Sequence, residues 1–327
     1  MISVSVIIPS AGRRPELLQR AIKSALIDDE KIQTEIIVIL NGKDGMVFDE
    51  YSSFQHTLVK YYKLEEGNVS KARNYGLSAA KGKLIRFLDD DDYLISEIAY
   101  QQYIELSDSN ADLSTYAGAI EDDIRRYQVI KPIDIDDYCA ATLSAYCPAL
   151  TFASVYKKRI LKNCIWDESL SFMEDENWMR SIAKFGVNNW IHKNDIVGIW
   201  YQHEYERLSI TIGSNHFYQS RAVSIIQLIN SLTANNQLTP IRACYAAKGL
   251  WSAIHGGFPF NPIYWTNIAK TAINLDGKSR PNQYIFELFR FFNPICIEWS
   301  LLPLRKISRY FRMMKQDLFG KPSIRRI

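Results

Sequence analysis

The chain has 327 residues, of which 47% are hydrophobic and 23% are charged, a composition typical of folded proteins and unlike that of disordered chains. A chain of this length can bury a large core and exceeds one small domain. Its formal net charge of +3 excludes a strongly basic balance, so we expect no nucleic-acid partner. The five cysteines form no C-x-x-C pair, which argues against a zinc site and a disulfide framework and favours a reducing cytoplasm.

Strand and helix signals alternate along the first part of the chain. Apolar, β-rich runs over Ser3–Ile8, Glu35–Leu40 and Thr57–Leu64 predict three strands. After the first run, Pro15 stands in the first turn of a predicted helix with an apolar face. This alternation predicts an α/β fold with a mostly parallel sheet flanked by helices, and it puts the strand-to-helix loops at the edge where such sheets bind ligands.

The most informative stretch runs from residue 67 to residue 94. It predicts a helix over Val69–Ala80, ended by Gly82 as a C-cap, and a short strand over Leu84–Leu88. Four consecutive acids, Asp89–Asp92, follow that strand directly. Adjacent carboxylates repel one another, and Mg²⁺ is usually held by one or two carboxylates together with substrate phosphates. A solvated acidic turn is the alternative, but the position after a strand favours a metal site.

Two short motifs in this stretch belong together. Ala72-Arg73-Asn74 with Gly76, followed by Phe87-Leu88 and the four acids, matches the pattern A-R-N-x-G, a spacer and F-L-D-x-D-D. This composite resembles the hallmark of family 2 glycosyltransferases of the GT-A fold, of the bacterial polysaccharide type, in which the D-x-D motif binds metal and donor diphosphate. The resemblance implies a GT-A (Rossmann-like) mixed, mostly parallel sheet flanked by helices. It also implies a nucleotide-sugar donor, with UDP-sugar favoured and a dTDP- or GDP-sugar left open, and a divalent metal, Mn²⁺ or Mg²⁺.

The resemblance further assigns roles to single residues. Seven would contact the nucleotide part of the donor: Pro9, Ser10, Arg13, Asn41, Arg73, Asp89 and Asp90. Asn41 stands where relatives usually carry an Asp, and its amide can both donate and accept at a uracil or thymine edge. Two residues, Asp91 and His203, would bind the metal. An ordinary surface or core histidine is the alternative for His203.

A second group of acids lies about 85 residues further along the chain. Glu174, Asp175 and Glu176 open a predicted helix that carries Trp178 on its apolar face. Acids at a helix start are favoured by the helix dipole, so a capping role is the alternative. The arrangement resembles the family's E-D motif, which makes Asp175 the catalytic base, with either neighbouring glutamate as the alternative.

From residue 213 the pattern changes to successive helices, so we expect a catalytic domain over 1–212 and a helical region over 213–327. Residues 303–327 hold eight basic residues and one acid, and aromatic and aliphatic residues precede them. This combination suits a helix lying on an anionic membrane, whereas a terminal helix packed on its own domain is the alternative. No segment reads as a signal peptide or a membrane span, so we expect a peripheral protein at the cytoplasmic face of the membrane.

Together these features predict an inverting glycosyltransferase that uses a glycan or lipid-linked saccharide acceptor in cell-surface polysaccharide synthesis, such as that of O-antigen. A sugar nucleotidyltransferase would need a G-G-x-G-T-R opening and a dinucleotide oxidoreductase G-x-G-x-x-G after the first strand, and both motifs are absent. A non-catalytic scaffold that binds a nucleotide sugar or a membrane is the alternative from another class. The intact acids and Asp175 argue against it.

Overall fold

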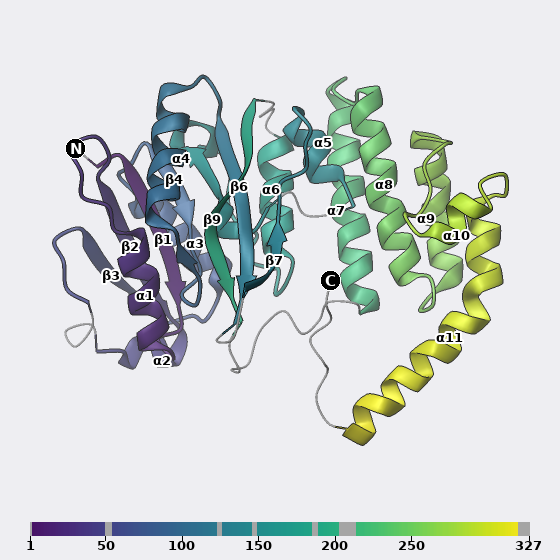
Figure 1. Ribbon diagram of the computed structural model, residues 1–327, viewed down its shortest axis with the longest axis horizontal. Helices are drawn as coiled ribbons and strands as arrows, with labels where there is room; N and C mark the ends of the chain where they lie inside the picture. Colours follow the sequence, from purple (N-terminus) through teal and green to yellow (C-terminus); the bar gives the residue numbers. More distant parts are fainter. Residues whose placement is uncertain are drawn as a thin grey trace. The chain divides into compact units, whose positions relative to one another are not determined.

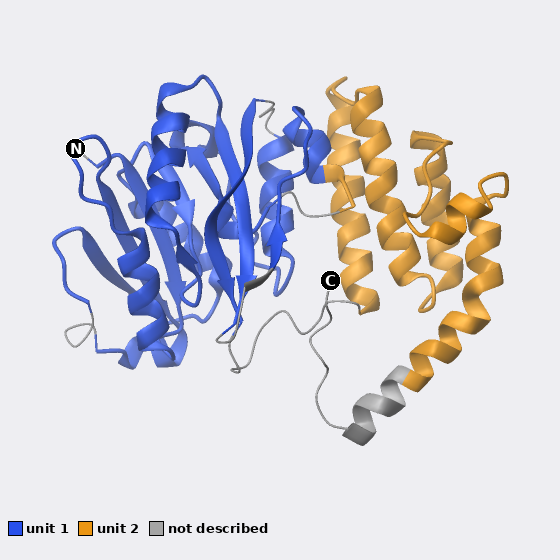
Figure 2. Cartoon of the chain, viewed as in Figure 1, with its two compact units in different colours: residues 1–142, 146–210 blue, residues 143–145, 211–327 orange. Residues whose placement is uncertain are grey.

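The computed structural model describes residues 2–49, 54–122, 126–145, 149–184, 189–202 and 214–319. The chain divides into two compact units (Figure 2): residues 1–142 with 146–210, and residues 143–145 with 211–327. Each unit has buried hydrophobic residues of its own. The domain boundary expected between residues 212 and 213 falls in a segment outside the described residues.

Unit 1 is built on one mixed sheet (Figure 1), which has nine strands among the described residues. They are β1 (Val4–Ser10), β2 (Thr34–Asn41), β3 (Val59–Leu64), β4 (Leu84–Phe87), β5 (Tyr93–Leu94), β6 (Leu113–Glu121), β7 (Arg126–Ile130), β8 (Ser154–Lys157) and β9 (Trp190–Tyr201). The order is β3-β2-β1-β4-β8-β6-β9-β5, and β7 pairs with β6. Strands β3, β2, β1 and β4 run parallel to one another, and β6 is parallel to β9. The β4–β8, β6–β8, β6–β7 and β5–β9 pairs are antiparallel.

Helices cover both faces of this sheet. They are α1 (Pro15–Ala25), α2 (Gly42–Val47), α3 (Val69–Ala79), α4 (Ser96–Asp108), α5 (Tyr138–Leu143) and α6 (Glu174–Lys184). Right-handed crossovers place α1 and α3 on opposite faces of the parallel strands. Every residue of β1 and β2 is buried, which explains why these strands are continuous apolar runs in the sequence. The predicted mixed α/β architecture is therefore confirmed.

Two glycines let α3 and the turn after it approach β1. A Cβ atom on Gly76 would lie 2.4 Å from Ile7 Cγ2, so only glycine permits this packing. The prediction that Gly82 caps α3 is wrong, because the helix ends at a C-cap on Ala80. Gly82 instead donates its N–H to Ser5 Oγ at 2.8 Å, and a Cβ there would lie 2.5 Å from Ser5 N. Close approach to β1 requires this glycine.

Two further boundaries differ from the sequence-based expectation. The segment 121–137 mixes charged residues with Tyr127 and Pro132, which predicts a loop, but it contains β7, which extends the sheet by pairing with β6. The sequence of residues 149–156 predicts a strand over that whole range, but the strand begins only at Ser154, because a 3₁₀ turn over Thr151–Ala153 precedes it. Both differences arise at short strands, β7 of five residues and β8 of four, whose local pattern is too short to fix their bounds.

Unit 2 is helical among its described residues, as the sequence predicts. Its helices are α7 (Asn215–Ala234), α8 (Pro240–Gly257), α9 (Pro262–Leu275), α10 (Tyr284–Leu288) and α11 (Pro294–Phe319). Ser214, Thr239 and Asn261 cap α7, α8 and α9 through their side-chain oxygens. No helix in the described part of the chain is both long and apolar enough to span a membrane.

A buried ion pair joins two helices of unit 2. Glu298 on α11 is 0% exposed, and its carboxylate lies 2.6 Å from both Arg305 Nη1 and His255 Nδ1. Arg305 also donates to the backbone oxygen of His255 on α8. A buried carboxylate needs such partners, so this cluster fixes α11 against α8.

Candidate active site

The carboxyl ends of β1, β2 and β4 meet at one edge of the sheet, because these strands are parallel neighbours. Ser10 ends β1 and donates from Oγ to Asp90 Oδ2 at 2.5 Å. Asn41 ends β2 and donates from Nδ2 to the backbone oxygen of Ser10 at 3.1 Å. The structure thus brings together Pro9, Ser10, Asn41 and the acids after β4 at the ligand-binding edge.

One arginine bridges two of the four acids. Arg14 donates to Asp90 Oδ1 and to Asp91 Oδ2, each at 2.7 Å. Burial raises the pKa of Asp90 to about 6, although the positive charge of Arg14 acts in the opposite direction. Arg13 points elsewhere and pairs with Asp44 at 2.5 Å, with both side chains exposed. Arg14, which the sequence analysis did not single out, is therefore the basic residue of this loop that contacts the acids.

Asp92 has a different environment from its neighbours. It is 5% exposed, and its Oδ1 accepts a hydrogen bond from the backbone N–H of Tyr201 at 3.0 Å. Burial, reinforced by the charges of Asp91 and Asp89, raises the pKa of Asp92 well above its usual value. Asp92 therefore holds the end of β9 at the site. Beyond that end, the expected metal ligand His203 lies outside the described residues.

Arg20 supports the same region from α1. Its guanidinium lies 4.5 Å from the centre of the Tyr93 ring and 4.0 Å from that of Tyr201. It also donates to the backbone oxygen of Asp91 at 2.8 Å. Contacts between a cation and aromatic faces stabilise such an arrangement, so Arg20 joins α1, β5 and β9 next to Asp91.

Arg73 on α3 connects the acids after β4 with the start of α6. It is 2% exposed and donates to Asp89 Oδ1 at 2.7 Å and to Glu174 Oε1 at 3.3 Å. Its guanidinium lies 4.3 Å from the centre of the Trp166 ring. One buried cation thus contacts carboxylates from two segments that are far apart in the sequence.

Asn74, the third residue of the A-R-N motif, holds that tryptophan. Its Oδ1 accepts from the N–H of Trp166 at 2.8 Å, and its Nδ2 donates to the oxygen of Trp166 at 2.9 Å. Trp166 stacks on Trp178 with ring centres 4.7 Å apart and meets the edge of Phe87 at 5.0 Å. Sequence reasoning assigned no role to Asn74, although the motif that contains it was the available signal.

Asp175 is the second residue of α6. Met173, which precedes the helix, has a φ of 58°, a conformation that is uncommon outside glycine. Burial and the nearby charges of Glu174 and Glu176 raise the pKa of Asp175 to about 7. Its Oδ1 accepts the N–H of Glu176 at 2.7 Å. A carboxyl group that titrates near neutrality suits a general base.

The acids could hold a divalent metal ion only together with a bound diphosphate, and not as a cage made of protein ligands alone. No group of three or more His, Cys, Asp or Glu side chains within the described ranges is arranged to hold a metal. The side chains of Asp89 and Asp91 are 36% and 22% exposed, so their oxygens are accessible. Mg²⁺ or Mn²⁺ bound by one or two carboxylates together with a diphosphate fits this donor set, whereas a cage made of protein ligands does not.

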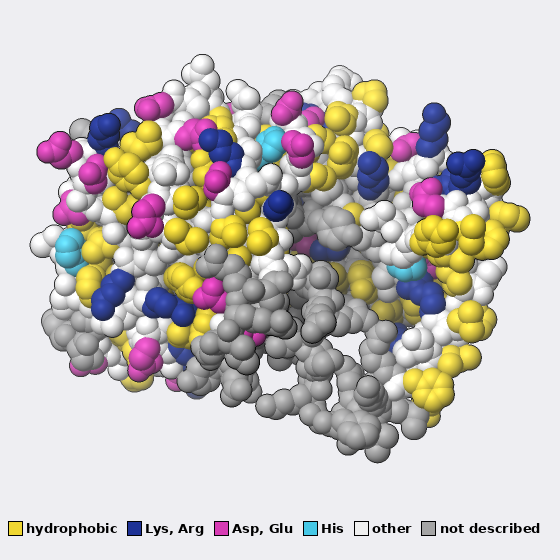
Figure 3. Space-filling model, viewed as in Figure 1, with side chains coloured by type: hydrophobic (Ala, Val, Ile, Leu, Met, Phe, Trp, Pro, Cys, Tyr) yellow, Lys and Arg dark blue, Asp and Glu magenta, His cyan; other side chains and the backbone are white. Residues whose placement is uncertain are grey.

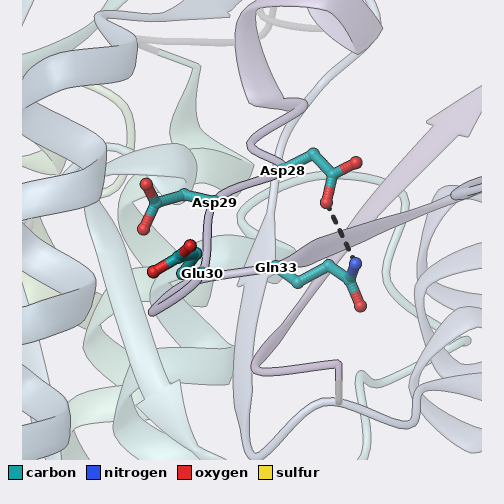
Figure 4. Close-up of a pocket in the computed structure, with 4 residues that line it drawn as sticks. All are labelled: Asp28, Asp29, Glu30 and Gln33. Atoms are coloured by element: carbon teal, nitrogen blue, oxygen red, sulfur yellow. Dashed lines mark hydrogen bonds between the residues drawn. The ribbon is translucent and has the colours of Figure 1, made fainter.

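An acidic depression elsewhere on unit 1 is separate from this site. It has a volume of about 400 Å³ and is lined by Asp28, Asp29, Glu30 and Gln33 (Figure 4). Gln33 donates to Asp28 Oδ1 at 3.0 Å. These residues precede β2, so they lie at the amino edge of the parallel strands, opposite the acids that follow β4.

Comparison with known proteins agrees with this geometry. Residues 5–142 match the family described as Glycosyl transferase family 2. Residues 5–142 therefore carry a family 2 glycosyltransferase domain. The matched residues include the A-R-N motif, Arg14 and the four acids.

Curated relatives of the glycosyltransferase domain come from bacteria. GgaB of Bacillus subtilis (strain 168), a minor teichoic acid biosynthesis protein, is 27% identical over 188 residues, which cover 52% of this chain and 20% of GgaB. EpsJ of the same strain, an uncharacterized glycosyltransferase, is 29% identical over 113 residues, which cover 33% of this chain and 31% of EpsJ. The chain therefore matches less than a third of the length of either relative.

Among solved structures, TarS residues 1–349 of S. aureus in complex with UDP-GlcNAc has a similar fold. The TM-score is 0.57 at 17% sequence identity, and the likeness covers 83% of this chain and 80% of the TarS chain. At this level of identity the likeness shows the fold of the domain, and the predicted GT-A class is confirmed.

Proposed function

We propose that this protein is an inverting, metal-assisted glycosyltransferase of cell-surface polysaccharide synthesis. It transfers a sugar from a nucleotide diphosphate sugar, with UDP-sugar favoured, to a hydroxyl group of a glycan or lipid-linked saccharide. One observation carries the proposal: Arg73 contacts both Asp89 of the acid cluster and Glu174 beside Asp175. A donor-binding carboxylate group and a candidate base therefore belong to the same site.

The donor binds at the carboxyl edge of β1, β2 and β4. We assign its nucleotide contacts to residues at or near the ends of these strands: Pro9, Ser10, Arg13, Asn41, Asp89 and Asp90. Arg73 of α3 supports this donor-binding group through its ion pair with Asp89. Asp91 and His203 are the proposed metal ligands. A bound Mg²⁺ or Mn²⁺ would neutralise negative charge on the leaving diphosphate.

Asp175 is the proposed base. Deprotonated Asp175 accepts the proton of the acceptor hydroxyl while the oxygen attacks the anomeric carbon opposite the diphosphate. Attack from that side inverts the anomeric configuration, so an α-linked donor gives a β-linked product. The raised pKa of about 7 makes Asp175 a stronger proton acceptor than an ordinary carboxylate while leaving it substantially ionised at neutral pH.

The relatives support the donor and acceptor classes. GgaB is named for teichoic acid biosynthesis, and TarS has been solved with UDP-GlcNAc. Both fit a transferase that extends or decorates a cell-surface polymer with a sugar from a UDP-sugar.

The test is calorimetric binding of UDP-, dTDP- and GDP-sugars, each with and without Mn²⁺. We expect metal-dependent binding of one donor class, lost in Asp91→Ala and kept in the exposed control Asp134→Ala. Asp175→Asn should bind the same donor but release no nucleotide diphosphate in the presence of acceptor. Failure of every donor to bind would refute the proposal, and binding without turnover in the unmodified protein would favour the scaffold alternative.

We also propose that unit 2 places the enzyme on the inner face of the cell membrane. Exposed hydrophobic side chains gather on α10, the turn after it and α11: Tyr284, Leu288, Phe289, Phe291, Phe292, Trp299, Leu304, Ile307, Tyr310 and Phe311. Leu304, Ile307 and Phe311 stand at helical spacing on one stripe of α11. Figure 3 shows basic side chains beside hydrophobic ones over this region. Aromatic and basic residues together suit an anionic lipid surface.

Vesicle flotation tests this surface. We expect binding to vesicles of phosphatidylcholine with phosphatidylglycerol, weaker binding to phosphatidylcholine alone, and loss of binding in Phe291→Glu, whose native side chain is 88% exposed. Val223→Glu on α7 is the matched control, because it puts the same charge on another exposed apolar position of unit 2. Equal binding of both variants to the anionic vesicles would contradict the assignment.

A further inference from the structure

We infer that Arg73 is a positioning residue that holds Glu174, and with it the neighbouring Asp175, at a fixed position relative to the acids that follow β4. The inference rests on the proposed role of Asp175 as the base. It gives the A-R-N motif a physical purpose that extends beyond binding the donor.

The guanidinium of Arg73 bridges two carboxylates that come from different segments of the chain. Its Nη2 donates to Asp89 at 2.7 Å and its Nη1 lies 3.3 Å from Glu174 Oε1. Asp89 follows β4, whereas Glu174 is the first residue of α6, 101 residues away from Arg73 in the sequence. The planar guanidinium offers separate donors in a fixed fork, so one side chain sets the distance between the two carboxylates.

The guanidinium of Arg73 is itself held in place by neighbouring residues. Trp166 lies under the guanidinium at 4.3 Å, and Asn74 fixes the backbone of Trp166 with hydrogen bonds of 2.8 and 2.9 Å. Stacking of an arginine on an aromatic face limits its rotation. Asn74 therefore positions Trp166, Trp166 positions Arg73, and Arg73 positions the start of α6.

Burial decides between a positioning role and direct contact with the donor. The Arg73 side chain is 2% exposed, whereas the Asp89 side chain is 36% exposed. A ligand that arrives at the acids meets Asp89 first, and Arg73 acts through it. Arg73 consequently fixes the position of Glu174, the residue next to the base, relative to Asp89, the acid on the donor side.

The same contacts set the electrostatic environment of Asp175. The negative charges of Glu174 and Glu176 raise the pKa of Asp175, and the positive charge of Arg73 lowers it. Removing Arg73 or Glu174 therefore has opposite consequences for the base, although both changes break the same ion pair. Loss of packing alone would not produce opposite signs.

The test is an NMR titration of Asp175 in protein labelled with ¹³C at the aspartate carboxyl carbons, with the signal assigned by its loss in Asp175→Asn. We expect Arg73→Gln to raise the pKa of Asp175 by about one unit, a tenfold loss of the ionised form below neutrality. Glu174→Gln should lower the pKa by a similar amount. Lys71→Gln is the matched control, since it removes one positive charge from an exposed position on the same helix and should leave the titration unchanged.

A kinetic measurement separates position from charge. Arg73→Lys keeps the positive charge but loses the two separate donors of the guanidinium. The pKa of Asp175 should therefore stay close to that of the unmodified protein. In contrast, kcat for release of UDP from a UDP-sugar should fall at least tenfold, while the donor KM changes less than twofold. An unchanged kcat in Arg73→Lys, or equal titrations in Arg73→Gln and Lys71→Gln, would overturn the inference. If Arg73→Gln does not fold, the lowered pKa of Asp175 in Glu174→Gln tests the inference instead. The titration needs no turnover, so failure of the proposed transfer reaction would be seen separately, as an absence of UDP release in the unmodified protein.

Discussion

Asp175→Asn should stabilise the fold while abolishing transfer. Asp175 has a pKa of about 7 in the folded protein, against an ordinary value of 3.8. The folded state therefore binds the Asp175 proton more tightly than the unfolded state does, so this group's contribution to stability is full below about pH 4 and is lost as pH rises towards 7. Asparagine is neutral at every pH, and its side-chain oxygen can still accept the N–H of Glu176.

The size of the effect follows from the two pKa values. Relative to a group with the same pKa in both states, Asp175 lowers the free energy of unfolding by about 4 kcal/mol at pH 8 and by about 2 kcal/mol at pH 5, where only the unfolded state releases the proton. The variant should gain most of this free energy of unfolding, and its advantage over the unmodified protein should grow between pH 5 and pH 8. Sites of catalysis commonly trade stability for activity in this way.

Urea unfolding at pH 5 and pH 8 measures the difference directly and requires no donor or acceptor. Asp134→Asn is the control, because the Asp134 side chain is fully exposed and its removal should change stability little at either pH. If Asp175→Asn were no more stable than the unmodified protein at pH 8, the view of Asp175 as a buried carboxylate ionised at a cost would be wrong.

Three further predictions concern packing. Gly82→Ala should lower the free energy of unfolding by about 1–3 kcal/mol, because the new Cβ would lie 2.5 Å from Ser5 N; an unchanged urea midpoint would contradict this close approach. Asn74→Ala should cost about 1–3 kcal/mol and alter tryptophan fluorescence, because two hydrogen bonds to Trp166 are lost; a spectrum like that of the unmodified protein would argue against the contact. Glu298→Ala should cost about 3 kcal/mol, since it leaves the partly buried His255 and Arg305 without a carboxylate, and thermal unfolding would reveal a smaller loss if that cluster were not formed.

The strands and helices that carry the site could be predicted because their signals are local. Strands β1 and β2 are buried on both faces, so their sequences are continuous apolar runs bounded by loop residues. The acids that follow β4 could also be placed at the ligand-binding edge of the sheet, because parallel strands end at the same edge. Local patterning therefore supplied the architecture of unit 1 and the position of its acid cluster.

Side-chain partners could not be predicted in the same way. The hydrogen bond between Asn74 and Trp166 joins residues 92 apart in the sequence, and it exists only because the fold brings α3 beside the segment before α6. The choice between Arg13 and Arg14 depends on the direction in which two adjacent loop residues point. No periodicity encodes that direction, since the loop has no repeating geometry.

Arg14 and Arg73 have a consequence for how the protein matures. Between them they place a guanidinium on Asp89, Asp90 and Asp91, so three of the four clustered acids carry an internal counter-ion. Under the proposed metal-assisted function, this chain should fold first and bind the divalent ion afterwards, unlike small domains that fold only when metal is bound. Chelation with EDTA should then leave the melting temperature unchanged, and a large fall would show that assembly depends on the ion. Under the same proposal, newly made protein would accumulate in a folded form during metal starvation and become active when the ion returns.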